Sequence, residues 1–234
     1  MRDVDNFIAV ICGLKSEAQV ILRVLDAPKI RVGVSGANAA RAEEIAREFC
    51  GEGAAAIVSV GVSGGLDPSL ASGDLIIGDR VLYGDGQVCE SDRRLLDTIA
   101  EEPAAATAKI GALFGADDII ESIEKKAALY RSHHALGVDM ESHGAARAAA
   151  SAGVPFLAIR AIADPADRAL PPAALGAVAP DGSTRILATL GAAMRDPKQF
   201  PALMKLGADS SAALKTLRRD LVPLFGRLFL SCDL

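Results

Sequence analysis

The chain has 234 residues, half of them hydrophobic, and a formal net charge of −5. This composition suits one well-buried α/β domain, and the acidic balance argues against nucleic acid as a partner. The four cysteines are scattered without a CxxC pair, and two of the three histidines are adjacent in sequence, so we expect a reduced compartment and no metal site. Neither a leader peptide nor a membrane-length apolar run is recognisable, which predicts a cytoplasmic protein.

The first third of the chain alternates short apolar runs with amphipathic segments. Strands are predicted over residues 7–12, 29–35 and 54–60, with helices after Gly13 and Gly36. On the first helix, an apolar face is expected from Leu14, Ala18, Ile21, Leu22 and Leu25. Glu17 in its first turn either complements the helix dipole or points into a crevice at the strand end.

A glycine-rich segment, Gly61-Val-Ser-Gly-Gly-Leu, follows the third predicted strand. It matches neither the dinucleotide-binding nor the Walker A pattern, so no cofactor is expected. We interpret it as a loop whose bare backbone N–H groups suit a phosphate, carboxylate or sugar. The expected anion or nucleophile loop comprises Ser35, Gly36, Gly61, Val62, Ser63 and Gly64.

The same segment also fits G-x-S-x-G, with Ser63 as the nucleophile of a serine hydrolase. That motif requires a helix directly after the serine, which Pro68 and the next apolar run disfavour. The serine hydrolase therefore stays a remote alternative.

Further along, strands are predicted over residues 74–83 and 107–114, and helices over 92–102, 122–132 and 184–195. From Phe200 the chain is expected to be helical, with Pro223 breaking or kinking the segment. We find no linker, so one catalytic domain is predicted over residues 1–196, with a helical extension over 197–234.

Two acids stand where apolar runs stop. Glu141 opens a predicted helix that closes at Gly153, and Asp164 ends an apolar strand that begins at Phe156. Each has a structural explanation, since Asp before Pro165 caps a turn and Glu suits the first turn of a helix. Open α/β sheets bind ligands at the carboxyl ends of strands, so the two acids together indicate a site.

Five stretches resemble, in order and spacing, the nucleoside phosphorylase and nucleosidase superfamily, which includes purine nucleoside phosphorylase and methylthioadenosine/S-adenosylhomocysteine nucleosidase. They are Ile11-Cys-Gly-Leu-Lys-Ser-Glu17, Ser35-Gly36-Ala-Asn, Gly61-Val-Ser-Gly-Gly-Leu, Val138-Asp-Met-Glu141 and Arg160-Ala-Ile-Ala-Asp164. The resemblance implies a single-domain, three-layer α/β/α fold with a mixed twisted central sheet, and a homo-oligomer.

The resemblance also implies an enzyme that breaks the N-glycosidic bond of a purine nucleoside. Asp164 would protonate the purine N7, and Glu17 and Arg160 would position the nucleophile. The sugar would be held by the stretch Asp139-Met140-Glu141, in which Glu141 binds the ribose hydroxyls. Four residues depart from the family pattern. Ile119 and Ile120 fall where nucleosidases place an aromatic residue over the base, Ala163 stands where they usually have Ser, and Val62 replaces a Ser that contacts phosphate or water.

The stretch 164–175 and the long tail resemble phosphorylase-like proteins associated with hopanoid biosynthesis. This implies phosphorolytic release of adenine from adenosylhopane, with inorganic phosphate as co-substrate. Hydrolysis is the alternative, and a nucleoside-binding protein without catalysis is a further one. The basic amphipathic tail, with Lys215, Arg218, Arg219 and Arg227, either lies on the inner face of an anionic membrane or packs on its own domain or a partner.

Overall fold

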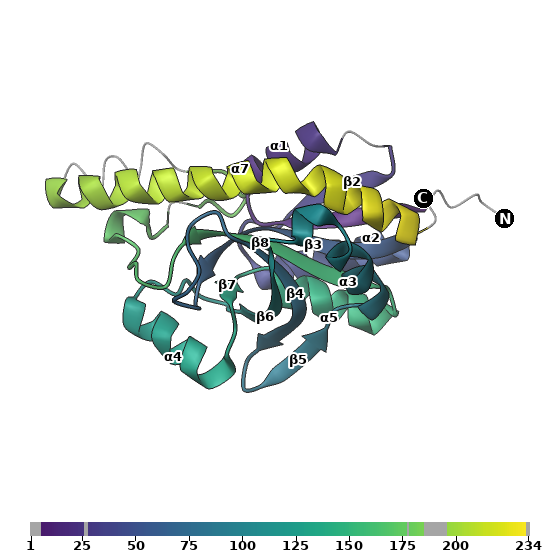
Figure 1. Ribbon diagram of the computed structural model, residues 1–234, viewed down its shortest axis with the longest axis horizontal. Helices are drawn as coiled ribbons and strands as arrows, with labels where there is room; N and C mark the ends of the chain where they lie inside the picture. The colour runs from purple at the N-terminus through teal and green to yellow at the C-terminus, as the bar shows by residue number, and fades with distance from the viewer. Residues whose placement is uncertain (1–5, 26–27, 177, 185–195, 233–234) are drawn as a thin grey trace.

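A mixed sheet of eight strands forms the centre of the computed structural model, which describes residues 6–25, 28–176, 178–184 and 196–232 (Figure 1). The strands are β1 (Phe7–Cys12), β2 (Ile30–Val34), β3 (Ala54–Gly65), β4 (Leu75–Tyr83), β5 (Gln87–Glu90), β6 (Lys109–Gly115), β7 (Gly137–Asp139) and β8 (Phe156–Asp164). Apolar runs next to Gly or Pro form β1 and β8, as the nearly complete burial of these two strands requires.

The strand order is β2-β1-β3-β7-β6-β4-β5, and β8 pairs with both β3 and β4. β3 runs parallel to β1 and β8, whereas β7 is antiparallel to β3 and β4 is antiparallel to β8. Strands β3, β7, β6, β4 and β8 therefore pair in a closed circuit. This closure brings the carboxyl ends of β3, β7 and β8 together.

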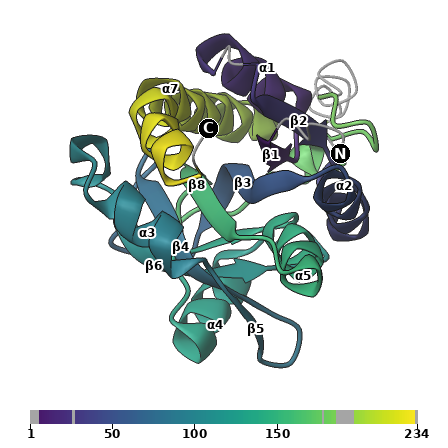
Figure 2. The same ribbon diagram turned by 90° about the vertical axis from the view of Figure 1, so that its right-hand side faces the viewer.

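Helices cover both faces of the sheet (Figure 2). They are α1 (Lys15–Val24), α2 (Ala39–Gly51), α3 (Arg93–Ala100), α4 (Ile123–His133), α5 (Ser142–Ala152) and α7 (Phe200–Ser231), with short 3-10 turns at Pro103–Ala105, Pro172–Ala174 and Pro197–Gln199. One apolar core joins α1, α3 and α7 to the sheet, and a second joins α2 and α5 to it. The predicted three-layer α/β/α fold with a mixed sheet is confirmed.

The glycine-rich segment is not a loop, because β3 continues through Gly65. Its residues pair with β8 on one side and with β7 on the other. The low strand preference of glycine is outweighed here by two neighbouring strands that complete the ladder. The sequence also gave no indication of the short strand β5, and Leu22, expected on the buried face of α1, is 55% exposed.

The tail is one helix, α7, which runs the length of the molecule (Figure 1). Pro223 lies inside it and does not end it. Leu221, Leu224 and Phe225 around the proline are fully buried in the core, and this packing outweighs the lost hydrogen bond, which costs about 3 kcal/mol. The helix predicted over 184–195 falls, apart from Thr184, outside the described residues. Within the described residues, no helix is both long and apolar enough to cross a bilayer.

Candidate active site

Three carboxylates meet where the strands end, and each lies against a glycine. A Cβ at Gly61 would stand 2.8 Å from Oε1 of Glu17, and one at Gly64 would stand 3.2 Å from Oδ2 of Asp164. A Cβ at Gly13 would overlap Oε1 of Glu141. The glycines of these motifs therefore provide space for acidic side chains, which is a different role from the anion-binding loop that the sequence suggested.

Glu17 is held by the backbone. Its Oε2 accepts hydrogen bonds from the N–H groups of Gly13 and Leu14, at 2.9 and 2.8 Å, and its Oε1 accepts one from Val62 at 2.8 Å. Burial raises the pKa of Glu17, while these three donors and the Arg160 charge oppose the rise. The result is a rigid carboxylate at the cavity wall that is able to accept a proton.

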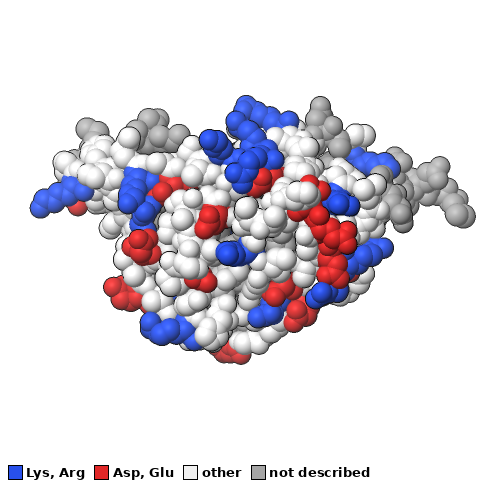
Figure 3. All heavy atoms as spheres, in the orientation of Figure 1, with Lys and Arg blue, Asp and Glu red and all other residues white. Residues whose placement is uncertain are grey.

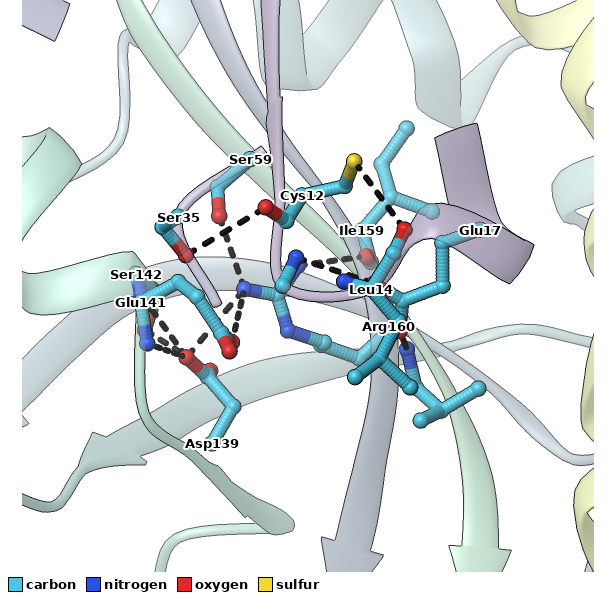
Figure 4. A network of polar contacts seen from close by, with 12 residues as sticks. Cys12, Leu14, Glu17, Ser35, Ser59, Asp139, Glu141, Ser142, Ile159 and Arg160 are labelled. Carbon is cyan, nitrogen blue, oxygen red and sulfur yellow. Dashed lines mark hydrogen bonds and ion pairs between the residues drawn. The ribbon is translucent and has the colours of Figure 1, made fainter. Parts of the chain in front are cut away.

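Arg160 is fully buried in β8 and points toward the start of α5 (Figure 4). One terminal nitrogen donates to Ser59 Oγ at 2.7 Å and lies 3.1 Å from Asp139 Oδ1 and 3.7 Å from Glu141 Oε2. The other terminal nitrogen donates to the carbonyl oxygen of Ile159 at 3.0 Å. Arg160 does not line the cavity. It supports two acids from behind, so any part that it takes in positioning the nucleophile passes through neighbouring side chains.

Asp139 and Glu141 share this guanidinium unequally. Asp139 accepts hydrogen bonds from the backbone of Glu141 and from the backbone and hydroxyl of Ser142, at 2.7–2.9 Å. Burial works to raise the pKa of Asp139, but Arg160 and these donors hold it below its ordinary value. Burial and the neighbouring Asp139 charge raise the pKa of Glu141 to about 8. Asp139 is therefore the anion that Arg160 neutralises, and Glu141 binds a proton more readily than an exposed glutamate does.

A cavity of about 900 Å³ opens from these acids. Its polar end is lined by Glu17, Ser63, Asp139, Glu141 and Asp164, together with Met140, Val62, Gly64, Ile119 and Ile120. Its other end is mainly apolar and is formed by Leu170, Ala174 and Val178 together with the first half of α7, namely Phe200, Leu203, Met204, Leu206, Gly207, Ser210 and Leu214. The sugar- and base-site residues expected from sequence thus share one cavity.

Within the described structure, the groups expected to bind an anion are already engaged in the fold. The N–H of Gly36 donates to the carbonyl oxygen of Gly13 at 3.0 Å, and that of Val62 donates to Glu17. The hydroxyl of Ser35 lies 3.3 Å from the carbonyl oxygen of Cys12, to which it donates. Strand pairing with β8 engages the Gly61–Ser63 backbone. These groups complete the fold and leave no cradle for phosphate among the described residues.

Ser63 is buried and its hydroxyl has no hydrogen-bond partner within the described structure. No described histidine serves it as a base, since His143 Nε2 lies 3.2 Å from Asp117, and His133 and His134 pack on aromatic rings. The strand also continues past Ser63 instead of turning into a helix. The geometry of a serine hydrolase is absent from the described residues.

Lys126 on α4 is the site residue that sequence reasoning missed. Its Nζ lies 2.6 Å from Asp164 Oδ2, and its side chain is completely buried. Burial raises the pKa of Asp164, and Lys126 and Arg168 partly offset that rise. In the sequence, the pair Lys125-Lys126 has the appearance of two surface lysines, and no local pattern distinguishes them.

The contact between Gly13 and Glu141 gives a testable prediction. Gly13→Ala should displace the Glu141 carboxyl and lower kcat/KM for a nucleoside about 10- to 100-fold, mainly through KM, because the resemblance leads us to expect Glu141 to bind the sugar. Gly51→Ala is the matched control, since a Cβ there meets nothing within 4 Å. Steady-state kinetics of both variants check the prediction, and equal kinetics for the two would contradict it.

Comparisons with known proteins agree with this geometry. The family model described as the phosphorylase superfamily matches residues 28–194. A 5'-methylthioadenosine/S-adenosylhomocysteine nucleosidase of Staphylococcus aureus is 30% identical over an alignment of 127 residues, which covers 46% of this chain and 56% of that protein. The chain thus matches about half the length of that curated relative.

Solved structures share the fold over nearly the whole chain. Futalosine hydrolase of Helicobacter pylori superimposes with a TM-score of 0.74 and 18% identity, over 97% of this chain and 99% of that one. The 5'-methylthioadenosine/S-adenosylhomocysteine nucleosidase of Neisseria meningitidis gives a TM-score of 0.67 and 19% identity, over 93% and 99% of the two chains. The fold that surrounds the three carboxylates is therefore that of these nucleoside-cleaving enzymes.

Proposed function

Because this chain belongs to the phosphorylase superfamily, we propose that it hydrolyses the N-glycosidic bond of a purine nucleoside. The observation that carries the proposal is the set of three carboxylates around one cavity, of which Glu17 and Glu141 are buried and Glu17 is fixed by three backbone N–H groups. Breaking this bond builds positive charge on the ribose and negative charge on the departing base. Carboxylates beside the sugar and an acid beside the base match those two charges.

Each acid takes a distinct part in the proposed reaction. Glu141, which follows Met140, binds the ribose hydroxyls. Glu17 removes a proton from the attacking water, whose oxygen bonds to the anomeric carbon. Asp164 gives its proton to N7, so that the glycosidic bond breaks and the base leaves neutral. Ile119 and Ile120 line the same cavity and supply an apolar surface for the base.

Charge favours water over phosphate. The Arg160 guanidinium, which lies near Glu17 and Glu141, is engaged by Asp139, Glu141 and Ser59, and it is shielded from the cavity. A phosphate ion beside Glu17 would meet a carboxylate, and the cation and backbone donors that the described residues place there are already engaged. This supports hydrolysis rather than the phosphorolysis that the hopanoid-associated subgroup implied. The relatives named above are likewise a nucleosidase and a hydrolase.

The apolar half of the cavity suggests what the sugar carries. At about 900 Å³ the cavity lies near the upper end of the range for sites that hold a drug-sized molecule, and a nucleoside bound among the acids leaves the α7 end empty. Leu203, Leu206 and Leu214 offer that end no polar partner. We therefore propose an adenine nucleoside with a bulky hydrocarbon on C5′, and adenosylhopane has this chemistry.

The test is adenine release in a buffer that contains phosphate, so that either nucleophile is available. Adenosine and an adenosine bearing a saturated hydrocarbon on C5′ are incubated with the purified protein, and adenine is measured by chromatography. We expect adenine from both, with the lower KM for the hydrocarbon-bearing nucleoside. Nucleoside binding without adenine release would instead identify a binding protein. A protein that shows no nucleoside binding and no adenine release would overturn the proposal.

A hydrocarbon-bearing nucleoside resides in a membrane, and we propose that the outward face of α7 meets it there. Lys215, Arg218 and Arg219 are exposed, as is Val222 at 51%. Figure 3 shows basic side chains gathered on the edge of the molecule along which α7 runs. Basic residues with isolated apolar ones suit an anionic lipid surface. The buried stripe of α7 is already packed in the core, so this face is the part that remains available.

Liposome sedimentation tests the membrane contact. The protein is expected to sediment with anionic vesicles and not with neutral phosphatidylcholine vesicles. Replacing Lys215, Arg218 and Arg219 by Gln should abolish sedimentation at about 0.1 M salt and leave cleavage of soluble adenosine unchanged. A wild-type protein that ignores anionic vesicles would contradict the proposal.

A further inference from the structure

Lys126 contacts four oxygen atoms around the end of β8. Its Nζ lies 2.6 Å from Oδ2 of Asp164 and 3.0 Å from the carbonyl oxygens of Asp164, Pro165 and Arg168. The three carbonyl oxygens can only accept, and Oδ2 accepts when the carboxyl proton is on Oδ1. The arrangement therefore suits an ammonium ion, whose three protons are shared among the four oxygens.

A buried lysine is costly for a fold, because its charge must leave water. The side chain of Lys126 has no exposed surface, whereas that of Lys125 is 58% exposed and pairs with Glu121 at i,i+4 on the surface of α4. An apolar side chain would fill the same space on α4 without a desolvation cost. The position of the ammonium beside Asp164 therefore indicates a role in the site.

The contacts fix one oxygen of Asp164 and leave the other open. Oδ2 and the backbone from 164 to 168 are held by Lys126, while Oδ1 accepts no hydrogen bond from any described residue. Asp164 lines the cavity. We propose that Lys126 is the positioning residue of the general acid: it holds Oδ2 so that the proton on Oδ1 points at the leaving base. This inference rests on the proposed function.

The charge of Lys126 acts at a defined moment. As the proton moves from Oδ1 to N7, the N7 lone pair forms the new N–H bond and Asp164 becomes a carboxylate. The adjacent ammonium stabilises that carboxylate as it forms, without giving up a proton of its own. Lys126 thereby makes a buried carboxylic acid strong enough to donate.

Besides Lys126, one basic and two acidic side chains lie around Asp164. Arg168 faces it from the loop after β8, and its guanidinium pairs with Asp209 on α7. Asp118 and Glu141 line the same cavity. Since burial raises the pKa of Asp164 and Lys126 is the leading charge that lowers it, removal of Lys126 should leave the acid protonated to a higher pH.

The experiment compares Lys126→Met with Lys125→Met in the full chain. For Lys126→Met we expect kcat to fall on the order of 10²-fold with little change in KM. The alkaline limb of the kcat profile should move upward by about 1 to 3 pH units. Lys126→Arg keeps the charge but not the four-oxygen geometry, so its kcat should fall while its alkaline limb stays in place. Lys125→Met should match the wild type.

A role confined to folding predicts other results. An unshifted alkaline limb in Lys126→Met would overturn the proposal. The proposal would also be overturned if Lys126→Met lowered kcat by the same factor in the Asp164→Asn enzyme as in the wild type. If Lys126→Met does not fold, a Lys126→Arg variant with wild-type kcat overturns it instead. If the wild type cleaves no nucleoside, the proposed function fails. In that case, carbon-13 NMR titration of the Asp164 carboxyl in the wild type and in Lys126→Met shows separately whether Lys126 sets the protonation of Asp164.

Discussion

Asp164→Asn is expected to lower kcat about 10²- to 10⁴-fold, the range for loss of a general acid. The amide has nearly the same shape and can still accept from Lys126, so the fold and KM should change little. What it lacks is a transferable proton for N7 as the glycosidic bond breaks. Steady-state kinetics measure the effect, with whichever of the two nucleosides of the adenine-release assay is cleaved faster.

Asp167→Asn is the control, because Asp167 is exposed three residues later in the same loop. It should retain wild-type kcat. An Asp164→Asn enzyme with unaltered turnover would remove this residue from the mechanism, and with it the role proposed for Lys126.

Glu17→Gln should reduce kcat by a similar factor, about 10²- to 10⁴-fold, for a different reason. Water would lose the base that takes its proton. In addition, the amide NH2 would face one of the three backbone N–H groups that now donate to the carboxylate. We expect a lower Tm as well as lower kcat, whereas Asp164→Asn should affect kcat alone.

Glu44→Gln on the exposed face of α2 provides the matched control, with neither effect expected. Retention of full activity by Glu17→Gln would show that water is activated elsewhere in the site. The proposal of Glu17 as the base would then have to be abandoned.

Strands β1 and β8 were predictable because burial on both faces demands continuous apolar runs, and Gly or Pro marks their ends. Phe7–Cys12 is predicted and observed with the same bounds, and the strand that begins at Phe156 ends at Asp164 as expected. The convergence of Glu141 and Asp164 followed from the rule that ligands bind at the carboxyl ends of strands. Those two acids needed no knowledge of side-chain packing.

The supporting residues could not be predicted in this way. Alternation along β8 gives no direction for Arg160, because apolar residues face both sides of this buried strand. Its partners Asp139 and Ser59 come from two other strands. Lys126 becomes a site residue only when α4 packs beside the end of β8. In each case the partners are set by tertiary contacts that lie far apart in the sequence.

The glycines illustrate the same limit in another form. A run such as Gly61–Gly65 suggests an exposed backbone, and the sequence cannot show that β7 and β8 pair with it. Nor can it show that a missing Cβ makes room for an acid from a distant segment, as at Gly61 and Glu17. The motif was located correctly, but its physical role depends on the completed sheet.

The identity of the nucleophile is the central claim, and product analysis across a phosphate titration tests it most directly. The enzyme is incubated with nucleoside at increasing phosphate concentration, adenine and reducing sugar are quantified, and phosphorus-31 NMR is used to look for a sugar 1-phosphate. The account predicts a rate independent of phosphate, with one free reducing sugar for each adenine and no sugar 1-phosphate. A rate that rises from near zero with phosphate, together with a sugar 1-phosphate signal, would contradict it.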